Sequence, residues 1–149
     1  MLKVYLAGRI SGLSYDEAIG WRNKVIDEFA GMNIELINPM RQKTYLSGEK
    51  AIKEIYPNTT CSGSKAIYNR DKFDVQRSDV ILVNWDTAGD NRMIGTCCEI
   101  GMAAILNKMI LLVDSKQGGD GELVHPFTNE PSIIFKSMKD AIKFIKSLI

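Results

Sequence analysis

The sequence lacks the features that identify a disulfide-rich, zinc-binding or membrane protein. It has only three cysteines, and two of them, Cys97 and Cys98, are adjacent, which is not a disulfide framework. Its one histidine, His125, is far from the cysteines, so no zinc-type ligand spacing exists. No apolar run has membrane-spanning length, and the first residues contain no signal-peptide hydrophobic region. We therefore expect a cytoplasmic protein that uses no metal and no cofactor.

An excess of charge of one sign is also absent. The chain has 19 basic and 18 acidic residues, for a net charge of +1. This balance provides no field that would hold a nucleic acid polymer or an anionic membrane, so we expect neither as a partner. The length of 149 residues and the apolar fraction of 45% suit one globular domain, residues 1–149, with a real hydrophobic core.

What the chain does contain is an alternation of apolar runs and amphipathic segments. Strands are predicted at 3–7, 33–37, 80–83, 108–114 and 132–135, and helices at 15–29, 65–77, after Gly95-Thr96 and at 137–148. Residues 40–64 have weak periodicity and are predicted to form a long, partly helical excursion. Strands that alternate with helices are typical of a parallel sheet with right-handed crossovers. We therefore expect an α/β fold, a flavodoxin-like or Rossmann-like doubly wound sheet of five strands in the order 2-1-3-4-5.

The stretch from Asp79 to Ile105 places a carboxylate where such folds bind ligands. A buried strand is followed by a polar loop and then by a helix that carries Glu99 in its first turns. Loops at the carboxyl ends of parallel strands line a crevice, so Glu99 is the first candidate for chemistry. The alternative is that Glu99 only complements the helix dipole, as acidic residues near a helix N-terminus commonly do.

The turn from Gly8 to Gly12 follows the first strand. A glycine-bearing turn there lets backbone amides approach a phosphate, although glycines in tight turns often have a purely steric reason. The G-x-G-x-x-G dinucleotide spacing is absent. In the expected strand order the first and third strands are neighbours, so this turn and the segment from Asp86 to Glu99 form one pocket.

Three other residues have a chemical and a simpler interpretation. Asp71 lies among core-facing positions of the helix predicted at 65–77, which is unusual for a carboxylate, but a solvated residue at the margin of that face would look the same. Cys97 and Cys98 lie near a helix N-terminus, where thiolates are stabilised. We favour the simpler interpretation for both cysteines, as small, mostly buried helix residues.

Five short motifs occur in a recognisable order. They are YLAG at 5–8, NP at 38–39, IYNRD at 67–71, SDVILVNWD at 78–86 and GTCCEIGMA at 95–103. Together they resemble the nucleoside 2-deoxyribosyltransferase superfamily, whose relatives include hydrolases of nucleoside 5′-monophosphates. The last motif, after its hydrophobic strand, is the most specific of the five.

The resemblance implies an enzyme that cleaves an N-glycosidic bond. It assigns Glu99 as the nucleophile that forms a glycosyl-enzyme ester, Asp71 as the acid that helps the base depart, and Tyr5 as the residue that orients the nucleophile. We expect a transferase that passes the sugar of a nucleoside or nucleotide to a free nucleobase. The alternative within this class is a 5′-monophosphate hydrolase that passes the sugar to water.

The sequence departs from the family pattern before the nucleophile. Transferases usually carry an aspartate six residues before the glutamate, where this chain has Met93. Asp90 lies three residues further back, and we assign it to recognition of the base. Arg92, in the same loop, is a candidate for holding a 5′-phosphate, since guanidinium matches phosphate geometry.

The first turn resembles that of the monophosphate hydrolases, in which a serine hydroxyl and backbone amides hold the 5′-phosphate. Here the corresponding substrate-binding residues are Gly8, Arg9 and Ser11.

The family commonly forms symmetric oligomers in which a neighbour's C-terminal region closes the pocket. We therefore expect a homodimer or a higher homo-oligomer, with 125–127 or Asn129 as the contributing residues. Because fold does not determine function, a non-catalytic nucleotide-binding or signalling module remains the rival from another class. A flavin-binding relative is disfavoured, because the first turn lacks a hydroxyl-rich phosphate loop.

Overall fold

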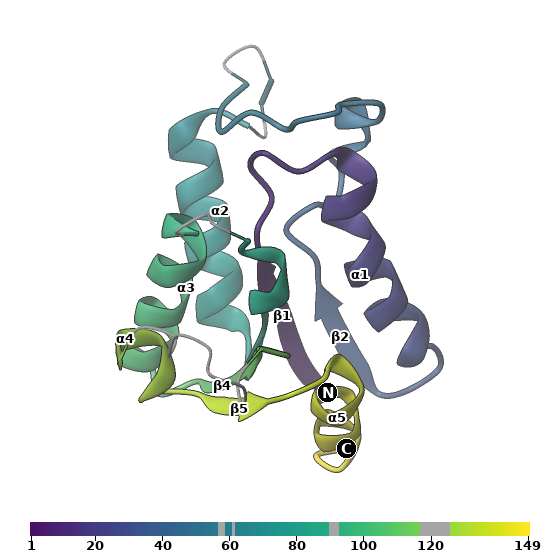
Figure 1. The fold of residues 1–149 in the computed structure, drawn as a ribbon, viewed down its shortest axis with the longest axis vertical. Helices are drawn as coiled ribbons and strands as arrows, with labels where there is room; N and C mark the ends of the chain where they lie inside the picture. Colours follow the sequence, from purple (N-terminus) through teal and green to yellow (C-terminus); the bar gives the residue numbers. More distant parts are fainter. Residues whose placement is uncertain (57–58, 61, 90–92, 117–125) are drawn as a thin grey trace.

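The computed structural model describes the chain except residues 57–58, 61, 90–92 and 117–125. The described residues form a five-stranded, all-parallel sheet with helices on both faces (Figure 1). The strand order is β2-β1-β3-β4-β5, which confirms the predicted fold and order. None of the helices among these residues is both long enough and apolar enough to cross a lipid bilayer.

The elements largely follow the predicted pattern. The strands are β1 (Leu2–Gly8), β2 (Ile34–Ile37), β3 (Val80–Asn84), β4 (Met109–Val113) and β5 (Ile133–Phe135), and the helices are α1 (Tyr15–Glu28), α2 (Ser64–Arg77), α3 (Ile94–Ile105), α4 (Pro126–Asn129) and α5 (Met138–Lys146). Two 3₁₀ turns, η1 (Thr44–Leu46) and η2 (Trp85–Thr87), complete the list. The short helix α4 was not predicted. In the described part of the 40–64 excursion the only regular element before α2 is η1, so the excursion is less helical than predicted.

Helix α1 starts where its sequence signal places it. The Ser14 side chain accepts a hydrogen bond from the Glu17 backbone N–H at 3.3 Å, and the Glu17 carboxylate accepts one from the Ser14 N–H at 2.8 Å. This reciprocal pair satisfies two backbone donors that would otherwise have no partner at the helix start. The start of α1, and with it the length of the turn after β1, is therefore determined locally.

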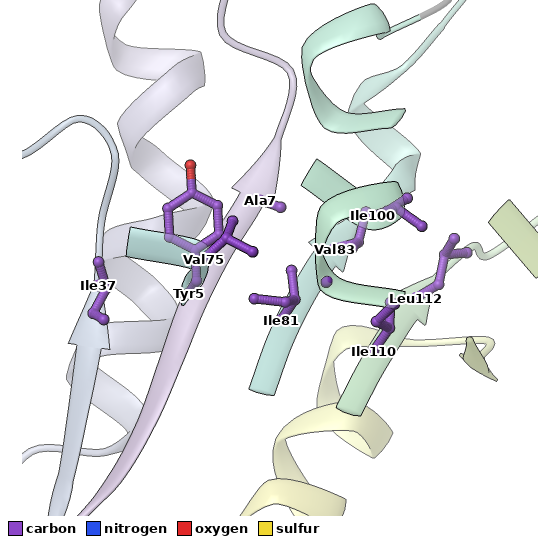
Figure 2. Packing of buried hydrophobic residues seen from close by; sticks show 10 residues of the cluster. Tyr5, Ala7, Ile37, Val75, Ile81, Val83, Ile100, Ile110 and Leu112 are labelled. Carbon is purple, nitrogen blue, oxygen red and sulfur yellow. The ribbon is translucent and has the colours of Figure 1, made fainter. Parts of the chain in front are cut away.

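Side chains that alternate along the strands build two apolar layers. Tyr5, Ala7, Ile81 and Val83 project toward α2 and α3, while their sequence neighbours project toward α1 and α5. Figure 1 shows the two pairs of helices on opposite sides of the sheet, and Figure 2 shows the first layer from close by. The central strand β3 is buried along its whole length, as expected for a parallel sheet covered on both faces.

The parallel register brings the ends of β1 and β3 together. Gly8 pairs with Asn84, so the turn after β1 and the segment after β3 leave the sheet at the same edge. The chain changes direction in the strand order at this point, which is where open α/β sheets form a crevice.

The excursion after β2 forms a wall over this edge. Its Ile52 N–H donates to the Leu13 carbonyl at 2.7 Å, and the Gly12 N–H donates to the Ile52 carbonyl at 2.8 Å. Leu46 and Ile52 pack with Ala18 of α1 in a third apolar cluster. Figure 1 shows the segment running from the α1 side to the α2 side above the sheet edge. Polar and apolar contacts therefore attach the excursion to the first turn.

Replacing a central-strand residue tests the two-layer core. Ile81 is fully buried, and Ile81→Ala is expected to lower the free energy of unfolding by about 2–5 kcal/mol, since it removes buried methyl groups and leaves a cavity. The control is Ile105→Ala. Ile105 lies at the end of α3, on the face opposite the buried Glu99 and Ile100, and is 83% exposed. Its substitution is expected to change the same quantity by less than about 0.5 kcal/mol in urea unfolding. Equal losses for both variants would contradict this layer assignment.

Candidate active site

A buried hydrogen bond joins β1 to α3 below the crevice. The Tyr5 hydroxyl donates to Glu99 Oε1 at 2.5 Å. Tyr5 is fully buried, and Figure 2 shows its hydroxyl pointing toward the carboxyl end of β1. Glu99 is only 9% exposed, and it lies on the inward face of α3 with Ile100 and Ala103. A residue that merely complemented the helix dipole would be solvated, so the burial favours the chemical interpretation of Glu99.

Asp71 reaches the same place from α2. It is half-buried, and its Oδ1 is buried with no hydrogen-bond partner among the described residues. Burial raises the pKa of its carboxyl above the ordinary value, while the positive charge of Lys43 opposes that rise. A buried carboxyl atom without a partner is costly unless a ligand or water contacts it. Asp71 therefore resembles a group exposed to a binding site rather than a solvated residue at a helix margin.

The electrostatics of Glu99 are dominated by burial. Loss of water raises the pKa of its carboxyl to about 8, although the hydrogen bond from Tyr5 lowers it. Negative charge on Asp71 raises the pKa further, and positive charge on Arg22 and Lys43 lowers it. The pKa of Tyr5 is raised well above its ordinary value, first by burial and then by the charge of Glu99. Tyr5 therefore stays protonated and remains a donor to Glu99.

Glu99, Asp71 and Lys43 border a cavity of about 400 Å³, a size that suits a small molecule. Its walls come from the first turn, the excursion, α2 and the start of α3. The lining residues are Gly8, Arg9, Ile10, Ser11, Lys43, Leu46, Ile52, Lys53, Glu54, Tyr56, Ser62, Ile67, Asp71, Met93, Ile94, Gly95, Thr96 and Glu99. The cavity therefore contains Glu99 and Asp71 together with the three first-turn residues predicted to bind the substrate.

The first turn is shaped by close contacts at Gly8. A Cβ atom there would lie 3.1 Å from Trp21 Cζ2 and 3.3 Å from the Asn84 carbonyl oxygen. Arg9, which is half-buried, donates from Nε to the Ser11 carbonyl at 3.0 Å and from Nη1 to the Ala88 carbonyl at 3.4 Å. Its guanidinium thus braces the turn against the segment after β3 while it lines the cavity.

Several predicted residues do not contribute to the described site. Asp90, Arg92 and His125 lie outside the described residues. Phe127 is 83% exposed on α4, and neither it nor Asn129 lines the cavity. The suggested contribution of this region to a neighbour's pocket stays a prediction.

The cysteines are poor candidates for nucleophiles. Cys97 is half-buried, and burial raises the pKa of its thiol, which disfavours the thiolate. Cys98 is exposed, so the prediction that both thiols are mostly buried is wrong for this residue. Among the residues that the structure describes, no three acidic, histidine or cysteine side chains are grouped in a way that could hold a metal ion.

Sequence reasoning missed the fully buried Arg22. From α1 it donates to the carbonyls of Leu6 at 3.2 Å, Gly8 at 2.9 Å and Ala18 at 2.5 Å, and so holds the end of β1. Burial lowers the pKa of its guanidinium to about 10. A signal was present, because Arg22 is in helical phase with the buried residues Ala18 and Val25. Lys43, also missed, is buried at 5% exposure in a segment without periodicity, where no sequence pattern indicates its direction.

Replacing the buried carboxyl tests its electrostatic environment. The folded protein holds a proton on Glu99 up to about pH 8, whereas the unfolded chain loses it near the ordinary pKa of 4.5. The contribution of Glu99 to the free energy of unfolding is therefore fully present below about pH 4.5 and is lost as the pH rises through about 8. The side chain of the variant Glu99→Gln is always neutral. The free energy of unfolding of this variant, relative to that of the wild type, should therefore increase between pH 5 and 9 by on the order of a few kcal/mol.

The measurement is urea unfolding of both proteins across that pH range. Glu54→Gln is the matched control, because Glu54 lines the same cavity but is exposed. A pH-independent difference between Glu99→Gln and the wild type would show that Glu99 ionises normally.

Comparison with known proteins shows the family. The model for the family described as nucleoside 2-deoxyribosyltransferase matches residues 4–130. No similar protein was found among curated sequences. A 2-desoxiribosyltransferase from Leishmania mexicana is 16% identical, with a TM-score of 0.70 over 99% of this chain and 98% of that one. A conserved protein from Enterococcus faecalis V583 is 18% identical, with a TM-score of 0.70 over 100% and 99% of the two chains.

A third solved structure, CMP N-glycosidase from Clostridium botulinum, has a TM-score of 0.57 at 13% identity over 99% of each chain. At these identities the three structures show a shared fold, whereas the family model covers most of the sequence. The chain therefore belongs to the nucleoside 2-deoxyribosyltransferase family.

Proposed function

We propose that this protein cleaves the N-glycosidic bond of a nucleoside, a deoxynucleoside or a 5′-monophosphate of either, and passes the sugar to another base. The observation that carries the proposal is the Glu99 carboxyl, which is buried beside a ligand-sized cavity and held there by the Tyr5 hydroxyl at 2.5 Å. Family membership supports glycosyl transfer in general.

The chemistry has two balanced halves. Glu99 Oε2 attacks C1′ of the sugar, because Oε1 accepts the hydrogen bond from Tyr5. The bond from C1′ to the base nitrogen breaks, its electron pair leaves with the base, and Asp71 supplies a proton to that base. A nitrogen of the incoming base then attacks C1′ and gives its proton to Asp71. The ester bond breaks with its electrons on Glu99, which restores the enzyme.

Burial raises the pKa of both carboxyls, which fits the role of Asp71 and opposes that of Glu99. The raised pKa of Asp71 favours a protonated acid that can donate to the leaving base. Glu99 must be ionised to attack, and the positive charge that develops at C1′ in an oxocarbenium-like transition state stabilises its carboxylate. Because the two carboxyls interact, their protons leave in coupled steps, and activity should depend on pH at both limits.

A second candidate is hydrolysis of nucleoside 5′-monophosphates, with water as the acceptor. It is favoured by three basic side chains on the cavity wall, Arg9, Lys43 and Lys53, which suit a phosphate. The fold shared with CMP N-glycosidase from Clostridium botulinum is consistent with it. A module that only bound nucleotides would need no buried carboxyl held by a tyrosine, so the site geometry disfavours that rival.

Removal of the nucleophile provides the main test. Glu99→Ala is expected to lower the rate of base release by about 10³-fold or more, because no ester can form. Mass spectrometry of the wild type with a deoxynucleoside should find a glycosyl adduct on Glu99. The control Glu54→Ala removes an exposed carboxylate of the same cavity and should keep most of the activity. Undiminished base release by Glu99→Ala would falsify the covalent mechanism.

The acceptor is tested separately by product analysis. We expect a deoxynucleoside or its monophosphate, incubated with a different free base, to yield the exchanged nucleoside or nucleotide. Chromatography distinguishes this product from free sugar or sugar phosphate, which would indicate the hydrolase. Tight binding with no base release from any tested nucleoside or nucleotide would contradict both enzymatic activities and support the binding module.

A further inference from the structure

The segment after β2 is fastened to α2 by charged side chains. Arg41 donates from Nη2 to Asp74 Oδ1 at 2.9 Å and lies 2.6 Å from Oδ2 through Nη1. The side chain of Asp74 is fully buried, and Arg70 of α2 donates in turn to the Pro39 carbonyl. A buried carboxylate bound in this way tolerates little displacement, because an unpaired buried charge is costly. The start of the excursion is therefore held against the helix that carries Asp71.

A backbone reversal at Gln42 directs the next side chain into the site. Gln42 has φ of +59°, a left-handed conformation that residues other than glycine adopt rarely. Strained conformations persist where the surrounding structure holds them, often at functional sites. Arg41 before the reversal binds α2, whereas Lys43 after it lines the cavity at 5% exposure. The fold therefore places a lysine beside the two carboxyls of the proposed mechanism.

Among the described residues that line the cavity, Lys43 is the cation that acts on both carboxyls. It lowers the pKa of Asp71, against burial, and it lowers the pKa of Glu99 in the same way. Glu99 is also faced by Tyr5 of β1 and by Arg22 of α1. Arg22 donates to the backbone carbonyls of Leu6, Gly8 and Ala18 and does not line the cavity.

Asp71 is faced by further charges of both signs. Arg70 and Arg41 lower its pKa, and Asp74 raises it. The contacts of Arg41 with Asp74, and of Arg70 with Pro39, anchor the excursion. Neither arginine lines the cavity, so within the described part of the chain Lys43 is the cation best placed to influence the shared charge of the two carboxyls.

We propose that Lys43 is a positioning residue for this reaction, whose buried ammonium favours negative charge on the Glu99–Asp71 pair and so readies Glu99 for attack. This inference rests on the proposed function, in which Glu99 attacks as a carboxylate and Asp71 donates a proton. Without Lys43 both carboxyls should hold their protons to higher pH. The pH optimum should then move as a whole, because both limits of activity shift in the same direction.

The test uses three variants of the whole chain. Lys43→Met replaces the ammonium by an apolar side chain of similar length, Lys43→Arg keeps the charge, and Lys53→Met removes an exposed cation from the same cavity wall. The titration of ¹³C-labelled glutamate and aspartate carboxyls is followed by NMR without substrate. The Glu99 signal is assigned by its absence from Glu99→Gln.

In Lys43→Met we expect the Glu99 midpoint, and the acid limb of kcat/KM, to move about one pH unit toward alkaline values. Lys43→Arg should stay near the wild type, and Lys53→Met should leave both midpoints in place. If Lys43→Met does not fold, Lys43→Gln takes its place. Unmoved midpoints in the folded variant would overturn the inference. So would a rise in KM confined to 5′-phosphorylated substrates with both limbs unmoved, since Lys43 would then act only by binding phosphate.

The NMR titration separates this inference from the proposed function, because it needs no turnover. Full activity of Glu99→Ala would contradict the covalent mechanism. A shift of the carboxyl midpoints in Lys43→Met would then have no bearing on catalysis. An inactive Glu99→Ala together with unmoved carboxyl midpoints in Lys43→Met would overturn the role of Lys43 alone.

Discussion

The hydrogen bond from Tyr5 to Glu99 requires a carboxyl group to lie where water is nearly excluded. Tyr5 is fully buried in β1, and its hydroxyl donates to the Glu99 carboxyl of α3. Burial raises the pKa of that carboxyl to about 8, so the folded protein resists the ionisation that nucleophilic attack needs. The neighbouring charges change this pKa: Asp71 raises it, whereas Arg22 and Lys43 lower it.

Two cations from segments distant in sequence lower the pKa of Glu99. Arg22 approaches from α1 while it holds the end of β1, and Lys43 approaches from the excursion after β2. The positive charge of each lowers the pKa of Glu99. A site built this way gives up some stability for reactivity, which is common where strained or poorly solvated groups perform chemistry. The ionisation of Glu99 therefore depends on residues from several segments outside its own helix α3.

Much of the architecture could be predicted because its signals are local. Buried strands are apolar runs, the start of α1 is a capping box at Ser14, and alternating strands and helices restrict the sheet to few topologies. The juxtaposition of the first turn with α3 followed from that topology. Matching motifs then assigned Tyr5, Asp71 and Glu99. In the structure Asp71 and Glu99 line one cavity, and Tyr5 is hydrogen-bonded to Glu99.

Local pattern alone determined the five strands, the four longer helices, their order along the chain and the position of the acidic residue on α3. Only the tertiary structure decided how far Glu99 is removed from water, and that Lys43 turns inward after the reversal at Gln42. The physical reason is that burial and charge depend on which segments distant in the chain pack around a residue, and periodicity reports only on its near neighbours.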